Sequence, residues 1–123
     1  MATLPDTPRF RYSTEMRLRK KTDFDAVFEI RRRASAGPIL LFVRANDVGR
    51  TRMGISMSRR VGIAPRRNCI KRKLREAFRL SYRDLPPGWD LVVVPRPHEP
   101  MPLERYLAIL RDLTGRACRA EAR

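Results

Sequence analysis

A half-buried strand leads directly into a strongly cationic helix in the middle of this chain, and the remaining elements must pack around that pair. Met53, Ile55 and Met57 alternate with glycine and serine, which is the period-2 pattern of a strand with one buried face. Gly62 ends the alternation, and Pro65 suits the first turn of a helix, where its missing N–H is not needed. The pattern therefore predicts a strand, a turn and then a helix.

The two sides of the predicted helix differ in character. One side repeats apolar residues at i, i+4, i+7 and i+8 and needs a core to pack on; these are Ile70, Leu74, Ala77 and Phe78. At about 100° per residue, the other side gathers a cationic stripe, made of Asn68, Lys71, Arg72, Arg75 and Arg79. Residues 59–79 contain nine basic residues and one acid, a net charge of +8 within the +15 of the whole chain.

A stripe with one sign of charge indicates a polyanionic ligand. Solvated helix faces usually pair acids with bases at i,i+4 spacing, whereas this helix offers only Glu76. Its self-repulsion stays uncompensated unless a polyanion supplies the opposite charge. A basic membrane-surface helix is the competing interpretation, but it needs an exposed apolar face, and the core needs that face here. The sequence thus favours a nucleic-acid face whose affinity falls steeply with salt.

The length of 123 residues suits one domain with a modest core. No apolar run approaches the roughly 20 residues that span a bilayer, and no signal peptide opens the chain. We therefore expect a cytoplasmic protein with no membrane partner. Cys69 and Cys118 are expected to be free thiols in a reducing compartment.

Hydrophobic periodicity outlines the other elements. It predicts a helix within residues 18–30 with Thr22 as its N-cap, an edge strand at 33–36, a strand at 39–45, a central strand at 89–94 and a helix at 103–119. Residues 15–119 then form one domain between a flexible basic arm at 1–14 and a frayed tail at 120–123. The order of elements predicts a two-layer α+β domain, helix–strands–helix–strand–helix around a small mixed sheet.

Aromatic residues mark a second candidate binding surface. Phe24 and Phe28 lie four residues apart on the first helix, a spacing that is also typical of core packing. Phe42 and Arg44 share the less apolar face of the strand at 39–45, where an aromatic beside an arginine can form a nucleic-acid platform. Ordinary sheet packing remains the alternative for Phe42.

Two serines are expected on the same sheet face as Phe42. Ser56 and Ser58 alternate in the predicted strand before the cationic helix. Small hydrogen-bonding side chains let a ligand backbone approach, although half-exposed strands also carry serine without a special role. We place a ligand on this face.

The residue types do not suggest chemistry by the chain itself. Two cysteines and one histidine, His98, have spacings that cannot make a zinc site. No glycine-rich phosphate loop precedes a helix, and the acids do not cluster as in a two-metal nuclease. We therefore expect a binding protein with no catalytic residue and no metal ligand of its own.

The central motif resembles the signature of the bacterial ribonuclease P protein component. Residues 54–62 read GISMSRRVG, residues 67–72 read RNCIKR and residues 74–79 read LREAFR. That family carries a strand of small residues and serines ending in two basic residues, Val and Gly, followed by an Arg-Asn-Arg-Ile-Lys-Arg helix. One departure is Cys69, which stands where the family has the second arginine of the triplet.

The resemblance implies a fold, a function and a set of partners. The fold would be ribonuclease P protein-like, and the chain would be the protein subunit of ribonuclease P. In that family the RNA subunit hydrolyses precursor tRNA with Mg²⁺, removing the 5′ leader to make mature tRNA 5′ ends. The protein binds the catalytic RNA and the leader, has no bound cofactor of its own, and takes no small-molecule substrate.

Two sites follow from the resemblance. Contacts with the catalytic RNA are expected from Arg59, Arg60, Arg67, Asn68, Lys71, Arg72 and Arg75. A cleft for the leader is expected from Phe24, Phe28, Phe42, Arg44, Ser56 and Ser58. Two other functions stay open, namely a ribosomal or other structural-RNA-binding protein with no part in catalysis, and a self-sufficient metal-dependent nuclease.

Overall fold

The computed structural model describes residues 16–121, with side chains described as far as Cys118. In chain order the elements are α1 (Lys21–Ile30), β1 (Arg33–Ala36), β2 (Ile39–Ala45), β3 (Arg52–Ile55), the short 3₁₀ helix η3 (Arg59–Val61), α2 (Ala64–Ser81), the 3₁₀ helix η4 (Tyr82–Asp84), β4 (Trp89–Pro95) and α3 (Leu103–Glu121). This is the predicted order of helices and strands.

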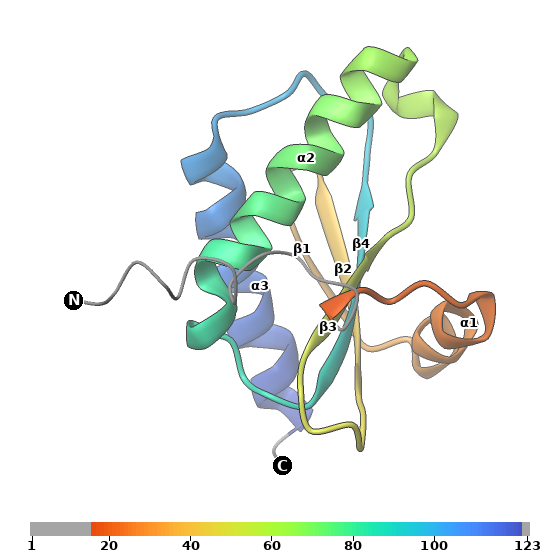
Figure 1. Ribbon diagram of the computed structural model, residues 1–123, viewed down its shortest axis with the longest axis vertical. Coiled ribbons are helices and arrows are strands. Elements are labelled where there is room, and N and C mark those ends of the chain that lie inside the picture. The colour runs from red at the N-terminus through yellow and green to blue at the C-terminus, as the bar shows by residue number, and fades with distance from the viewer. Residues whose placement is uncertain (1–15, 122–123) are drawn as a thin grey trace.

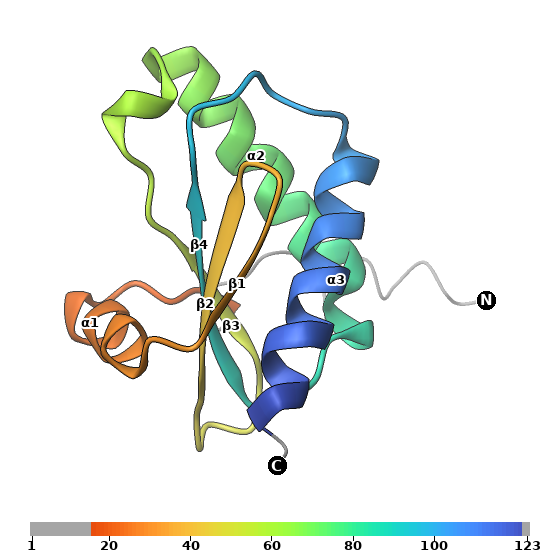
Figure 2. The ribbon, with the colours of Figure 1, turned by 180° about the vertical axis from the view of Figure 1, so that it is seen from behind.

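The four strands form one mixed sheet in the order β1-β2-β4-β3. β2 is antiparallel to both β1 and β4, whereas β3 runs parallel to β4. Parallel neighbours need a crossover connection, and α2 provides it. Figures 1 and 2 show α2 and α3 on one side of the sheet and α1 on the other. The predicted α+β domain with a small mixed sheet is confirmed.

The alternation along β2 separates the two faces of the sheet as expected. Ile39, Leu41 and Val43 are fully buried in the main core, beneath α2 and α3. Phe42 and Arg44 are half-buried on the opposite face, where α1 lies. β4 is the central strand and is buried on both faces, because helices cover each of them.

The long helices supply the rest of the core. On α2, the predicted apolar side is buried, and Leu74 and Phe78 have no exposed surface. On α3, Leu110 and Leu113 are fully buried. Tyr106 is also fully buried, which the aliphatic pattern of α3 did not predict, because its ring packs in the core while its hydroxyl finds polar partners.

The start of α1 differs from the prediction. Thr22 lies inside the helix and is not its N-cap; Lys20 holds that position, without a side-chain cap. The reason is that the preceding segment is extended along β3, where the Leu18 amide donates to the Met53 carbonyl at 3.0 Å. A chain held in that way cannot join the helix before Lys21.

The strand before α2 is shorter than its alternation suggests. β3 ends at Ile55, and the amide of Ser56 makes one more bond to the Val93 carbonyl, at 2.9 Å. Ser58 has left the sheet and caps η3, accepting a hydrogen bond from the Arg60 amide at 3.1 Å. The expectation that Ser58 shares a sheet face with Phe42 is therefore wrong.

The ends of the chain are only partly described. The predicted arm at residues 1–14 lies outside the described residues, as do 122–123 at the other end. α3 runs to Glu121, two residues past its expected end.

Candidate nucleic-acid interface

The cations of α2 fall into two groups, and the first is committed to contacts inside the domain. Arg66 pairs with Glu99 at 2.8 Å, Arg67 donates to the Gly62 carbonyl at 2.7 Å, Lys73 donates to the Met101 carbonyl at 2.8 Å, and Arg79 pairs with Glu76. The hydrogen bonds from Arg79 hold the pKa of Glu76 below its ordinary value, although burial opposes the shift. Arg67 thereby ties α2 to the turn at Gly62 that precedes the helix, and Arg66 and Lys73 tie it to the loop before α3.

The second group forms what we call the cationic surface. It consists of Lys71, Arg72 and Arg75 of α2, together with Asn68 of the same helix and with Arg59 and Arg60 of η3. All are exposed except Lys71, which is half-buried. No carboxylate in the described part of the chain pairs with Arg59, Arg60 or Arg72. Six of the seven predicted catalytic-RNA contacts therefore lie on this surface, and the seventh, Arg67, braces the turn that carries it.

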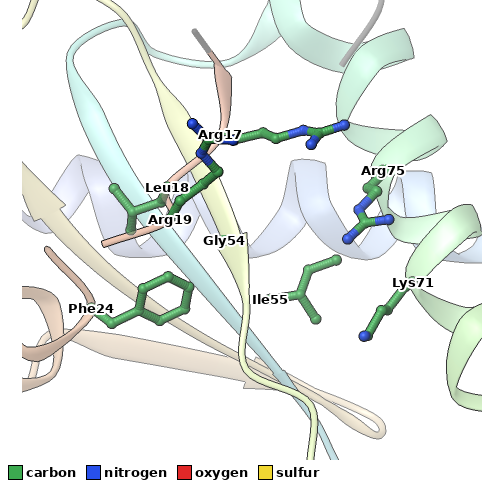
Figure 3. Close-up of a pocket in the computed structure, with 8 residues that line it drawn as sticks. All are labelled: Arg17, Leu18, Arg19, Phe24, Gly54, Ile55, Lys71 and Arg75. Carbon is green, nitrogen blue, oxygen red and sulfur yellow. The ribbon is translucent and has the colours of Figure 1, made fainter. Parts of the chain in front are cut away.

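A hollow of about 270 Å³ joins the cationic surface to the segment before α1. Lys71 and Arg75 of α2 line it on one side, and Arg17 and Arg19 line it on another. Figure 3 shows the Arg17 side chain reaching across towards Arg75. No described lining residue carries a carboxylate, so the hollow concentrates positive charge and suits an anionic group such as a phosphate.

Gly54 forms the floor of this hollow and brings an aromatic ring to it. A Cβ at Gly54 would lie 2.4 Å from Cζ of Phe24 and 2.9 Å from the Leu18 carbonyl oxygen. Only glycine leaves room for α1 to pack so closely on β3. Phe24 thus lies on one side of the β3 chain and Lys71 on the other (Figure 3), so that the aromatic and cationic sites meet here.

The predicted aromatic residues form a cluster on the α1 face of the sheet, which we call the aromatic cluster (Phe24, Phe28 and Phe42). Its members pack around buried Val27 and Val92 and are themselves half-buried. The Phe28 and Phe42 rings meet edge to face, with centroids 4.9 Å apart. Gly54 and Phe42 both pair with Val92, so the strand register places them in one row across the sheet.

Arg44, expected in the leader cleft, has a partner within the chain. Its guanidinium donates to Oδ2 of Asp90 at 3.2 Å. Asp90 is fully buried and also accepts from Arg52, through Nε and NH2 at 2.9 Å each, and from Asn46 at 2.7 Å. Burial alone would raise the pKa of Asp90, but these hydrogen bonds outweigh it and hold that pKa below its ordinary value.

Three residues of these sites were not assigned a role from the sequence. Arg17 and Arg19 precede α1 and meet α2 only through the tertiary fold. Asp90 did give a signal, because a lone acid in an apolar central strand needs a partner to be buried. The sequence did not say which cation would be that partner.

Cys69 lies on the side of α2 away from the hollow. Its half-buried thiol is close enough to Tyr106 of α3 to help burial raise the pKa of that phenol. The Tyr106 hydroxyl also contacts Nε2 of His98 at 2.8 Å and accepts from the Met101 amide at 3.2 Å. His98 therefore belongs to the packing of the loop on α3.

Residues 16–121 contain neither a metal-binding cluster nor a membrane-spanning helix. No group of three or more His, Cys, Asp or Glu side chains there could hold a metal ion. No helix in that part of the chain has the length and apolar content to cross a membrane.

The fold and these sites define a small α+β domain whose crossover helix carries a strongly positive surface. The family model for Ribonuclease P matches residues 12–118, and the chain belongs to that family. It is 37% identical over 111 residues to the ribonuclease P protein component of Desulfosudis oleivorans, which covers 87% of this chain and 92% of that protein. The Ruegeria pomeroyi protein of the same name is 42% identical over 86 residues, 67% of this chain and 68% of its own.

Solved structures agree with the family assignment. The ribonuclease P protein of Thermotoga maritima superimposes with a TM-score of 0.74 at 32% identity, over 81% of this chain and 96% of that one. The Staphylococcus aureus protein gives 0.72 at 26% identity, over 83% and 94%.

Proposed function

We propose that this chain is the protein component of ribonuclease P, an endoribonuclease that removes the 5′ leader of precursor tRNA. The family membership supports the proposal, and the observation that carries it is the cationic surface on η3 and α2. Within residues 16–121 no carboxylate pairs with Arg59, Arg60 or Arg72 of this surface, and such positive charge is what a polyanionic RNA partner requires. The protein is expected to work in the cytoplasm.

The catalytic RNA is the proposed ligand of the cationic surface. Arg59 and Arg60 would reach phosphates from the turn, and Lys71, Arg72 and Arg75 from the helix. Contacts with phosphates fix the position of a protein on RNA without reading sequence, which suits a subunit that docks on a large folded RNA. Asn68 adds an amide that can donate to or accept from a base edge or a ribose.

The 5′ leader is the proposed ligand of the aromatic cluster. A single strand can stack its bases on aromatic rings whatever its sequence, and leaders of different tRNAs differ in sequence. Phe24, Phe28 and Phe42 are half-buried, which leaves part of each ring available. Ser56 lies two residues beyond Gly54 and is half-buried, so its hydroxyl could contact the leader backbone. Arg44 and Ser58 already have partners within the chain, and their contact with the leader stays a prediction.

The chemistry is assigned to the RNA subunit. That RNA would carry out hydrolysis with Mg²⁺, and the protein would contribute binding energy for the precursor. Because the leader is absent from the product, contacts with it raise affinity for precursor over mature tRNA. The proposal therefore needs no catalytic residue and no cofactor in this chain.

A comparison of the affinities for precursor tRNA and for mature tRNA tests this proposal. In a complex of the protein with a bacterial ribonuclease P RNA, Phe42→Leu should weaken precursor binding by about tenfold and leave mature tRNA unchanged, since stacking is worth about 1–3 kcal/mol per base. Leu40→Ala is the matched control, because Leu40 is half-buried on the same strand face but has no ring. An equal loss for both RNAs would make Phe42 a packing residue only. Tight RNA binding with no preference for the precursor would favour a structural-RNA-binding protein.

A further inference from the structure

Two arginines lie beside Phe42, and they differ in their contacts within the chain. Arg44 lies two residues along β2 and is tied to buried Asp90, with 32% of its side chain exposed. Arg33 lies directly opposite Phe42 on the edge strand β1 and is exposed. Within residues 16–121 no carboxylate pairs with Arg33, so its five N–H donors remain available.

Arg33 stands beside the ring of Phe42. Its Cζ lies 6.0 Å from the Phe42 ring centroid, within the range of a cation–π contact. Phe28 meets the same ring edge to face, at an interplanar angle of 81°. Arg31 ends α1 with a φ of 64°, and this left-handed turn directs the chain into β1, where Arg33 comes into register with Phe42. The edge of the aromatic cluster therefore combines a ring with an uncommitted guanidinium.

A ring beside a guanidinium has the chemistry of a nucleotide subsite. A base can stack on an aromatic ring or on the plane of an arginine, and the guanidinium can donate two hydrogen bonds to a phosphate. Neither Arg44 nor Arg52 offers this, because the same carboxylate engages both guanidinium groups. Arg52 is also more enclosed, with 18% of its side chain exposed.

We infer that Arg33 is a specificity-determining residue of the leader site, where its guanidinium binds the phosphodiester of a leader nucleotide whose base stacks at Phe42. The inference rests on the proposed function and adds a residue that lies outside the central motif. Because the leader exists only in the precursor, this contact raises affinity for precursor and not for mature tRNA. It also gives the site a positive group on the opposite sheet face from α2.

The test compares two variants that each lose one positive charge. Arg33→Gln removes the proposed contact, and Arg105→Gln removes an exposed arginine from α3. Equilibrium affinity is measured for a cleavage-blocked precursor and for mature tRNA, with the protein assembled on a bacterial ribonuclease P RNA. Arg33→Gln should weaken precursor binding by about threefold to tenfold and leave mature tRNA unchanged. Arg105→Gln should change neither affinity.

A further variant separates stacking from charge. Arg33→Lys keeps the charge but loses the planar group, so it should recover only part of the precursor preference. Unchanged precursor affinity in Arg33→Gln, or an equal loss for both RNAs, would overturn the inference while leaving the proposed function intact. If the unmodified protein itself showed no preference for the precursor, that result would contradict the proposed function, and the inference about Arg33 with it. The thermal midpoints of the variants should match, since Arg33 is exposed on an edge strand.

Discussion

The two long helices, α2 and α3, lie side by side over the same face of the sheet, yet their outer sides differ in charge. α2 has 18 residues and carries seven basic residues against Glu76 alone. Residues 103–118 of α3, whose side chains are described, carry three basic residues and two acids. Its arginines also find acids, since Arg111 pairs with Asp84 at 2.9 Å and Arg116 with Asp112 at 3.1 Å.

This difference supports the proposal that α2 carries a binding face, whereas α3 carries a solvated one. Both helices bury an equivalent apolar side, so packing alone does not distinguish them. On α3 the charges are balanced locally, and the helix needs no ligand. On α2 internal partners engage Arg66, Arg67, Lys73 and Arg79, whereas no carboxylate within residues 16–121 pairs with Arg59, Arg60 or Arg72 of the cationic surface. We therefore expect RNA to bind to α2 and not to α3.

The largest effect should come from removing three charges from the cationic surface of η3 and α2 and, separately, three charges from α3. Arg60, Lys71 and Arg72 changed to Ala should lower affinity for ribonuclease P RNA by a factor on the order of 100 at moderate salt. The slope of log K against log salt should become shallower by about 2 to 3, because each phosphate contact contributes somewhat less than one unit. The measurement is a salt titration of RNA binding.

The matched control is the α3 triple variant, Arg105, Arg111 and Arg116 to Ala, which removes the same net charge. It should leave the slope almost unchanged. Equal slopes for the two triple variants would mean that the protein binds RNA through its overall charge and would break the comparison.

A smaller effect is expected from Cys69→Arg, which restores the residue type that the family signature has there. Cys69 is half-buried and its thiol lies close enough to Tyr106 of α3 to raise the pKa of that phenol, so we expect a longer, charged side chain to crowd this contact. Overpacking and a poorly solvated charge should lower the free energy of unfolding by about 1–3 kcal/mol. Denaturant unfolding measures this, and RNA affinity should not rise. Tighter RNA binding with unchanged stability would place position 69 on the cationic surface instead.

The smallest effect is expected from Glu76→Gln, which removes the single acid of α2. Affinity for RNA should rise by about twofold, as one repulsive charge is lost. Arg79 lowers the pKa of Glu76 in the folded state, so the ion pair stabilises the protein above the unfolded pKa and is lost as pH falls through the lower, folded pKa. Unfolding followed between about pH 5 and pH 2 should therefore show a shallower loss of stability in Glu76→Gln than in the unmodified protein. Asp112→Asn on α3 serves as the control and should leave RNA affinity unchanged.

Much of the fold could be predicted from the sequence because its signals are local. The alternation of β2 and the 3.6-residue period of α2 each report the buried side of one element, and both predictions are confirmed by residues such as Leu41 and Leu74. The failures come from tertiary contacts. Thr22 has good capping chemistry, but the pairing of Leu18 with β3 sets where α1 begins. Ser58 fits the strand alternation, but it caps η3 instead.

The candidate site was predictable in part for the same reason. The cationic stripe is a property of one helix and can be read from its spacing. The hollow between Arg17 and Arg75 joins segments that are distant in sequence, so only the fold brings them together. The Arg33–Phe42 pair depends on the register of the β1–β2 hairpin, which the sequence pattern did not specify. Arg44 shows the limit of prediction from sequence most clearly. Its strand and its face of the sheet were predicted correctly, but its partner, Asp90, lies 46 residues away in the chain.

The most direct measurement is cleavage of a precursor tRNA by a bacterial ribonuclease P RNA at low Mg²⁺, with and without this protein. The account predicts that the protein restores cleavage at the mature 5′ end and that the triple variant of the cationic surface (Arg60, Lys71 and Arg72 to Ala) restores it poorly, whereas the α3 triple variant restores it fully. No restoration by the unmodified protein, despite tight RNA binding, would contradict the account. Cleavage by the protein without any RNA subunit would contradict it as well and would indicate a self-sufficient nuclease.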